Sequence, residues 1–165
     1  MPSVVPPDVS LDLTNGAVFF VASTSLAVRH GLRDIVTHPA VSGLSDADRG
    51  SVELVLAEAL TNIVKHAYDS PDGQIELHLY RSSGRLHCDV FDAGVAMPNG
   101  EIPAGLAKPV GRDQDLPEGG FGWFLIRTLT KDLQYTRIDG RNRLSFQLNI
   151  DSNVWSAGIV SNRGE

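Results

Sequence analysis

The chain has 165 residues, of which 42% are hydrophobic and 21% charged, and its formal net charge is −6. This size and composition indicate one globular domain with its own core and exclude a disordered or fibrous chain. The acidic charge gives no electrostatic support for binding a phosphate backbone, so nucleic acid is not an expected partner.

The cysteine content and the apolar runs bear on the compartment. Cys88 is the single cysteine, which excludes an intrachain disulfide and favours a reducing, cytoplasmic environment. The longest apolar run, residues 17–22, is too short to span a bilayer, and the N-terminus lacks the pattern of a secretory signal. We therefore expect a cytoplasmic protein with no membrane partner. Residues 1–8 and 151–165 are expected to be tails around a domain at 9–150.

In chain order, the first expected element is a hairpin. Alternation at Val9, Leu11 and Leu13, followed by Asn15-Gly16, predicts a turn into a strand at 17–21. A helix is expected next, beginning after Ser23 and Thr24 as candidate caps and ending at Pro39.

A second, longer helix is expected from Ser45 as its cap to about Ala67, with apolar residues along one face. Alternation then predicts two antiparallel strands, centred on 75–79 and 86–90 and joined by a turn at 82–84.

The last third of the chain begins with an irregular segment. Residues 93–120 are rich in glycine and proline and have no period, and a loop of this length is usually functional or mobile. A helix at 121–133 and a closing hairpin of 133–138 with 144–150, turning at 139–142, follow. The expected fold is α+β: a two-layer sandwich in which helices cover one face of a mixed, mostly antiparallel sheet.

Three sequence features could carry chemistry. Glu58, Asn62, Lys65 and His66 lie on one side of the second helix, where they form either a functional ridge or an ordinary solvated face. Asp92-Ala93-Gly94 follows a core strand, where it could bind a ligand NH2 group or form a simple turn. Residues 118–126 run from a glycine-rich loop into a helix, a candidate anion site or a plain loop-to-helix junction.

The order of these features resembles one known arrangement. The stretch 58–68, EALTNIVKHAY, resembles the N-box of the ATP-binding superfamily that includes gyrase, MutL and histidine kinases. Asp92-Ala93-Gly94 resembles its first glycine box. Residues 119–126 and 135–144 are similar to the second glycine box and closing hairpin of the anti-sigma-factor serine kinases, the RsbW-like branch. The resemblance covers about residues 10–150 and implies a Bergerat-type ATP-binding fold.

The resemblance implies a role for each matching residue. Glu58 would be the catalytic general base, and Asn62 would hold Mg²⁺. His66 matches a recurrent histidine of the nucleotide site, for which a structural role is also open. Asp92 would bind the adenine amino group, and Gly94 would give the ring room. The second glycine box would wrap the ATP phosphates through Gly120, Phe121 and Gly122.

Two further positions concern the same site. Lys108 and Arg112 are the basic residues of the expected lid, and either could face the γ-phosphate. Ala96 stands where the first glycine box of the family has its second glycine, and we expect its methyl group to narrow the pocket.

The function implied by the resemblance is that of an ATP- and Mg²⁺-dependent serine/threonine protein kinase and anti-sigma factor. Such a protein phosphorylates an anti-sigma antagonist of the STAS type, alternately sequesters a sigma factor, and forms a homodimer. The alternatives are an ATP-binding docking module without kinase activity, favoured by Ala96, and a detached histidine-kinase catalytic domain, for which His30 would be the residue to test.

Overall fold

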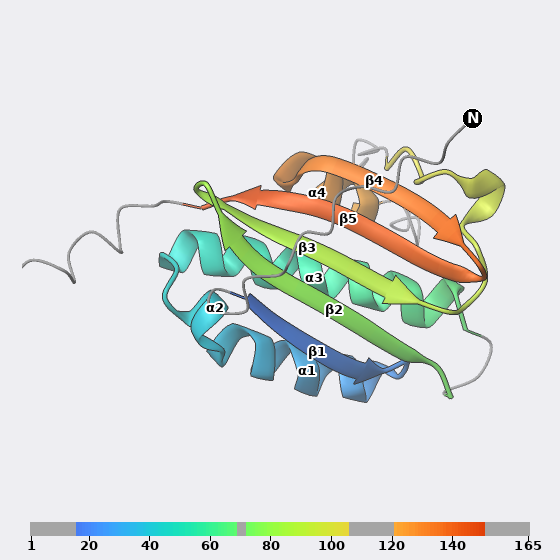
Figure 1. Ribbon diagram of the computed structural model, residues 1–165, viewed down its shortest axis with the longest axis horizontal. Coiled ribbons are helices and arrows are strands. Elements are labelled where there is room, and N and C mark those ends of the chain that lie inside the picture. The colour runs from blue at the N-terminus through green and yellow to red at the C-terminus, as the bar shows by residue number, and fades with distance from the viewer. Residues whose placement is uncertain (1–15, 69–71, 106–120, 151–165) are drawn as a thin grey trace, which may run out of the picture.

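The fold is taken from a computed structural model, which describes residues 16–68, 72–105 and 121–150. Within these ranges the predicted α+β class is confirmed. Five strands form one sheet in the order β1-β2-β3-β5-β4. Figure 1 shows the helices on one face of this sheet and none on the other. We expected a mixed, mostly antiparallel sheet. Every pairing between described strands is antiparallel, so the sheet they form contains no parallel pair.

The first strand and helix agree closely with the sequence. β1 spans Gly16–Ala22 and pairs with β2. The other half of the expected opening hairpin, at 9–13, lies outside the described residues. α1 spans Ser25–Thr37, and the Thr24 hydroxyl accepts a hydrogen bond from the Ala27 amide at its N-terminus, as predicted. A one-turn helix that was not predicted, α2, follows at Pro39–Ser42.

The central helix α3 spans Asp46–His66 and is capped by the Ser45 side chain. It lies between α1 and α4 in the helical layer (Figure 1). Its apolar face is completely buried against the sheet through Val52, Val55, Leu56 and Leu60.

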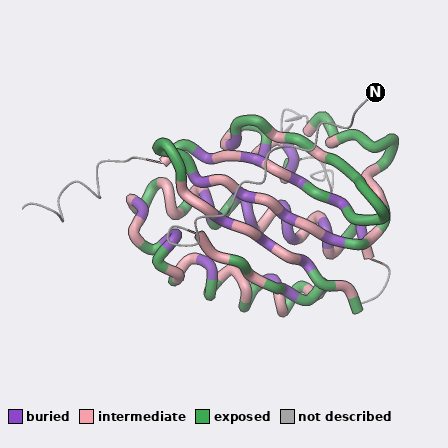
Figure 2. Tube along the Cα trace, in the orientation of Figure 1, coloured by how far each residue is buried: buried purple, intermediate pink, exposed green. Residues whose placement is uncertain are grey.

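The two central strands form the predicted hairpin. β2 spans Gln74–Ser82 and β3 spans Arg85–Asp92. Ser83 and Gly84 both have positive φ, which matches the right-handed twist of a two-residue hairpin. Burial alternates along both strands (Figure 2), and the side chains of Leu77, Leu79, Leu86, Cys88 and Val90 enter the core. Cys88, the single cysteine, is thus a buried thiol.

The C-terminal elements required two corrections. α4 spans Phe121–Leu129, four residues shorter than expected. The Thr130 hydroxyl donates to the Ile126 carbonyl oxygen at the end of the helix. The helix ends there because the next residue, Lys131, already pairs with β5 as the first residue of β4, Lys131–Ile138. β5 spans Arg141–Asn149, so the turn is Asp139-Gly140 and Asn142 is a strand residue. Its side chain is buried, whereas the sequence analysis placed Asn142 in the turn.

The segment after β3 is irregular, as expected, apart from a short 3-10 turn, η2, at Pro98–Gly100. Residues 106–120, with Lys108, Arg112 and Gly120, lie outside the described ranges. Among the described helices, none is both long and apolar enough to cross a membrane.

Candidate functional site

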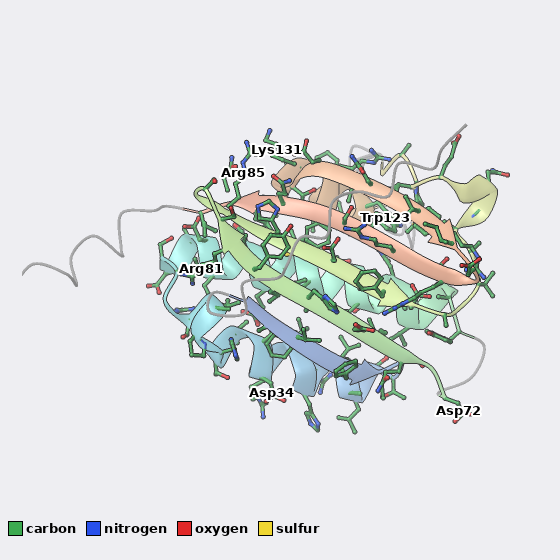
Figure 3. The ribbon with its side chains drawn as sticks, viewed as in Figure 1. Asp34, Asp72, Arg81, Arg85, Trp123 and Lys131 are labelled. Atoms are coloured by element: carbon green, nitrogen blue, oxygen red, sulfur yellow. The ribbon has the colours of Figure 1, made fainter. Side chains whose placement is uncertain are left out.

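A cavity of about 380 Å³ lies between α3, the sheet and the segment that follows β3. Asn62 and His66 reach it from α3, Asp92 from the end of β3, Ala96 from the following segment and Trp123 from α4. Trp123, labelled in Figure 3, is the third residue of α4. The other lining residues are Ala59, Ile63, Ala67, Val95, Met97, Pro98, Pro103, Tyr135, Asn142 and Leu144. Segments distant in the sequence therefore meet around one largely apolar chamber with a few polar groups, the usual form of a small-molecule site.

Asp92 supplies the carboxylate of the chamber. The residue is 7% exposed, and its Oδ1 accepts hydrogen bonds from the Gly94 amide and from Asn142 Nδ2, each at 2.8 Å. Within the described part of the chain, Oδ2 has no such donor. An unpaired carboxylate oxygen on a buried residue is suited to bind a ligand NH group.

Asn62 supplies an unused amide. Its Nδ2 is buried, and no hydrogen-bond partner for it is present among the described residues. A buried polar atom without a partner costs free energy unless a ligand or water pairs with it. A half-turn of the carboxamide would present its oxygen at the same place, so Asn62 fits a role as a ligand of Mg²⁺.

Glu58 lies one turn before Asn62 on α3 and is half-buried. A Cβ built at Gly122, the second residue of α4, would overlap the Glu58 carboxylate. The base candidate on α3 and the first turn of α4 are therefore in close contact. His66 ends α3 and is exposed at the rim of the chamber.

The two glycine boxes are placed by close contacts. A Cβ at Gly94 would overlap the Ala67 carbonyl group at the end of α3, and the next amide, Val95, donates to that carbonyl oxygen at 2.7 Å. The glycine thus lets the segment after β3 pack directly on α3, and its expected role of giving a ring room stays a prediction. Phe121 is exposed at the start of α4, and its ring stacks on Phe124 at 5.9 Å between centroids.

The expectation that the methyl group of Ala96 narrows the chamber stays a prediction. The residue lines the cavity, whose volume remains about 380 Å³ with the methyl group in place. This volume lies within the range of small-ligand pockets.

Three polar residues of the site, Asn142, Tyr135 and Arg137, were not predicted from the sequence. The Asn142 side chain contacts Asp92, Tyr135 lines the chamber, and Arg137 Nη1 donates to the Gly94 carbonyl oxygen at 2.9 Å. The one signal available was position: Asn142 precedes Leu144, Phe146 and Leu148 by even steps, which places a polar side chain on the inward face of β5.

Within the described ranges, no cluster of three or more His, Cys, Asp or Glu side chains could hold a metal ion. A nucleotide-bound Mg²⁺ does not need such a cluster, because Mg²⁺ keeps several waters and takes phosphate oxygens with one or two protein ligands.

Comparison with known proteins identifies the family of this chain. The sequence model of the histidine kinase-like ATPase domain, HATPase_c_2, matches residues 21–148. The serine-protein kinases RsbW of Bacillus thuringiensis (strain Al Hakam) and Bacillus anthracis are each 34% identical over 103 residues, which is 59% of this chain and 62% of the relative. The chain thus aligns with less than two thirds of the length of these relatives.

A solved structure supports the fold. The crystal structure of the RsbU and RsbW domains of Rv1364c from Mycobacterium tuberculosis aligns with 82% of this chain and 32% of that chain, with a TM-score of 0.53 and 15% identity. The predicted membership is confirmed by the family match over most of the chain: this protein belongs to the histidine kinase-like ATPase domain family.

Proposed function

We propose that this protein binds Mg-ATP in the chamber and transfers the γ-phosphoryl group to a serine or threonine of a protein substrate. The observation that carries the proposal is the meeting of Asn62, Asp92 and Trp123 around one chamber of about 380 Å³, within a fold whose family is an ATPase domain. The similarity to RsbW, named a serine-protein kinase, supports the reaction class.

Asp92 would accept a hydrogen bond from the adenine amino group through Oδ2, while Oδ1 is held by Gly94 and Asn142. Trp123, Met97 and Tyr135 supply apolar and aromatic surface for a purine ring. The base would thus be recognised by shape and by one carboxylate oxygen.

Asn62 would hold the magnesium ion, and the second glycine box, Gly120 to Gly122, would receive the phosphates at the start of α4. Bound Mg-ATP supplies the phosphoryl group, and its magnesium ion supplies positive charge that offsets the negative charge of the phosphates. Glu58, next to Gly122, would accept the proton of the attacking hydroxyl group. Its close contact with α4 supports this assignment, since a base must lie near the transferred group.

As to partners, we propose a STAS-domain anti-sigma antagonist as the phosphate acceptor and a sigma factor as the sequestered protein. A homodimer in the cytoplasm is part of the same proposal, and so are the domain limits 9–150. The support is the similarity to RsbW kinases. A phosphate on the antagonist would add about two negative charges and so weaken its docking.

Two variants with matched controls test the reaction. Asp92→Asn should weaken ATP binding in calorimetry by about 10-fold or more, because the amide turns an acceptor into a possible donor. Asp34→Asn changes an exposed aspartate that points into solvent from α1 (Figure 3), and should bind ATP like the wild type. Equal affinities of the Asp92 variant and the wild type would refute the adenine pocket.

Glu58→Gln should keep ATP binding and lower phosphoryl transfer by about 100-fold or more, the usual contribution of a general base. Glu53→Gln, an exposed glutamate on the same helix, is the control. The readout is labelled phosphate on a candidate STAS protein. Tight ATP binding without transfer in the wild type would leave the docking module as the function.

A further inference from the structure

Asn142 is a buried polar residue at the edge of the chamber. It is the second residue of β5, lies directly opposite Asp92 of β3 in the strand register, and is 4% exposed. Its neighbours Arg141 and Arg143 are exposed. Asparagine is rarely buried without a complete set of hydrogen bonds, so its partners indicate why it is there.

The partners of Asn142 determine how its carboxamide is oriented. Oδ1 accepts from the Tyr135 hydroxyl at 2.6 Å and from Arg137 Nη1 at 2.5 Å. The Tyr135 hydroxyl itself accepts from the Met97 amide at 3.1 Å, so its proton is directed to Asn142. Because a guanidinium group only donates, the Arg137 contact requires oxygen at this end of the carboxamide, and the Tyr135 hydroxyl donates to the same oxygen.

The other end of the carboxamide is therefore a donor, and it faces Asp92. Nδ2 lies 2.8 Å from Asp92 Oδ1 and 3.1 Å from the Val95 carbonyl oxygen. Together with the Gly94 amide, it gives Oδ1 two donors, and Oδ2 has none within the described part of the chain. A carboxylate bonded in this way cannot rotate without losing both hydrogen bonds.

The same residues hold the wall of the chamber. Arg137 donates to the Gly94 carbonyl oxygen, and Tyr135 accepts from Met97, so β4 is tied to both ends of residues 94–97. Neither Tyr135 nor Arg137 has a hydrogen bond to Asp92 within the described part of the chain. Both can affect that carboxylate through Asn142.

We propose that Asn142 is a positioning residue for base selectivity: oriented by Tyr135 and Arg137, it holds the Asp92 carboxylate so that Oδ2 accepts from the 6-amino group of adenine. The inference rests on the proposed function, because it assigns the orientation of Asp92 within the same nucleotide site. A held acceptor rejects a purine with a carbonyl group at that position, since two acceptors would face each other.

The first test compares ATP with inosine triphosphate, which carries a carbonyl group in place of the 6-amino group. In calorimetry the wild type should prefer ATP by about 10-fold or more. Asn142→Ala should weaken ATP binding by about 10-fold and reduce this preference to a few-fold. The reason is that the freed Asp92 carboxylate can swing away from the carbonyl group of the other base. Asn149→Ala is the matched control, an exposed asparagine on the same strand, and should retain both values.

The second test is a double-mutant cycle with Asp92→Asn. If Asn142 acts through Asp92, Asn142→Ala should cause little further loss of ATP affinity once Asp92 has been changed. A role in general stability would instead lower the affinity by the same factor in both backgrounds. Tyr135→Phe, which removes one of the two donors to Oδ1 and keeps the ring, should give a smaller loss of preference and is available if Asn142→Ala does not fold.

The third test needs no nucleotide. Amide hydrogen exchange at Gly94 and Met97 should be faster in the Asn142→Ala protein than in the wild type and the Asn149→Ala control. Unchanged exchange, or an unchanged ATP preference in a folded variant, would overturn the inference while leaving ATP binding intact. If the wild-type protein does not bind ATP, the proposed function is overturned, and this inference with it.

Discussion

Gly122 of α4 lies against the carboxylate of Glu58 on α3 so closely that a Cβ at Gly122 would overlap it. Gly122→Ala should therefore displace the proposed base while favouring the helix itself, since alanine is the better helix former. We expect phosphoryl transfer at saturating ATP to fall by about 10-fold or more, because small displacements of a catalytic group are costly. The measurement is single-turnover transfer beside calorimetry of ATP binding.

The outcome separates two roles of Gly122. Lost transfer with nearly unchanged ATP affinity supports its contact with Glu58 as the dominant one. Weaker ATP binding with unchanged transfer at saturation would assign Gly122 to the phosphates, and the prediction would then be wrong.

Gly50→Ala should stabilise the protein by about 0.5 to 1 kcal/mol. Gly50 is exposed within α3, and a Cβ at this position meets no atom within 4 Å. Alanine reduces the backbone freedom of the unfolded chain without creating a clash. The free energy of unfolding in urea measures the effect, and a loss of stability would contradict the open space around this position.

Ala96→Gly should leave ATP affinity within about 3-fold of the wild type, because the chamber already has ligand-sized volume with the methyl group present. The added backbone freedom should lower the free energy of unfolding by about 0.4 to 1 kcal/mol. Calorimetry and urea unfolding check the two parts. A large gain in ATP affinity would contradict this prediction and indicate that the methyl group of Ala96 restricts the pocket.

His87→Phe should make stability less sensitive to acid. Burial on the sheet lowers the pKa of His87 below its ordinary value, so between neutral pH and about pH 5 the unfolded chain takes up the proton more readily than the folded one. The free energy of unfolding therefore falls as the pH falls.

Phenylalanine removes this titration and can keep the stacking on Tyr80, whose ring lies 4.5 Å from that of His87. The fall in unfolding free energy between pH 7.5 and pH 5.5 should be smaller in the variant than in the wild type. Urea unfolding at the two pH values measures it, and an equal fall would contradict a role for His87.

Local patterns in the sequence determined most of the secondary structure and the pairing of β2 with β3. The caps at Thr24 and Ser45, the turn at Ser83-Gly84 and the alternating burial along β2 and β3 all depend on neighbours within a few residues. Short-range geometry of this kind can be read from periodicity. The end of α4 was missed because Thr130 and the irregular start of β4 compete with a helical pattern that continues through Leu133.

Only the tertiary structure decided which polar residues meet. Sequence order and motif resemblance indicated Asn62 and Asp92, but Asn142, Tyr135 and Arg137 reach Asp92 and its following segment through strand register and packing. In the same way, the contact of Gly122 with Glu58 depends on how α4 lies on α3. Contacts between residues tens of positions apart are fixed by the packing of whole elements, and no local pattern encodes that packing.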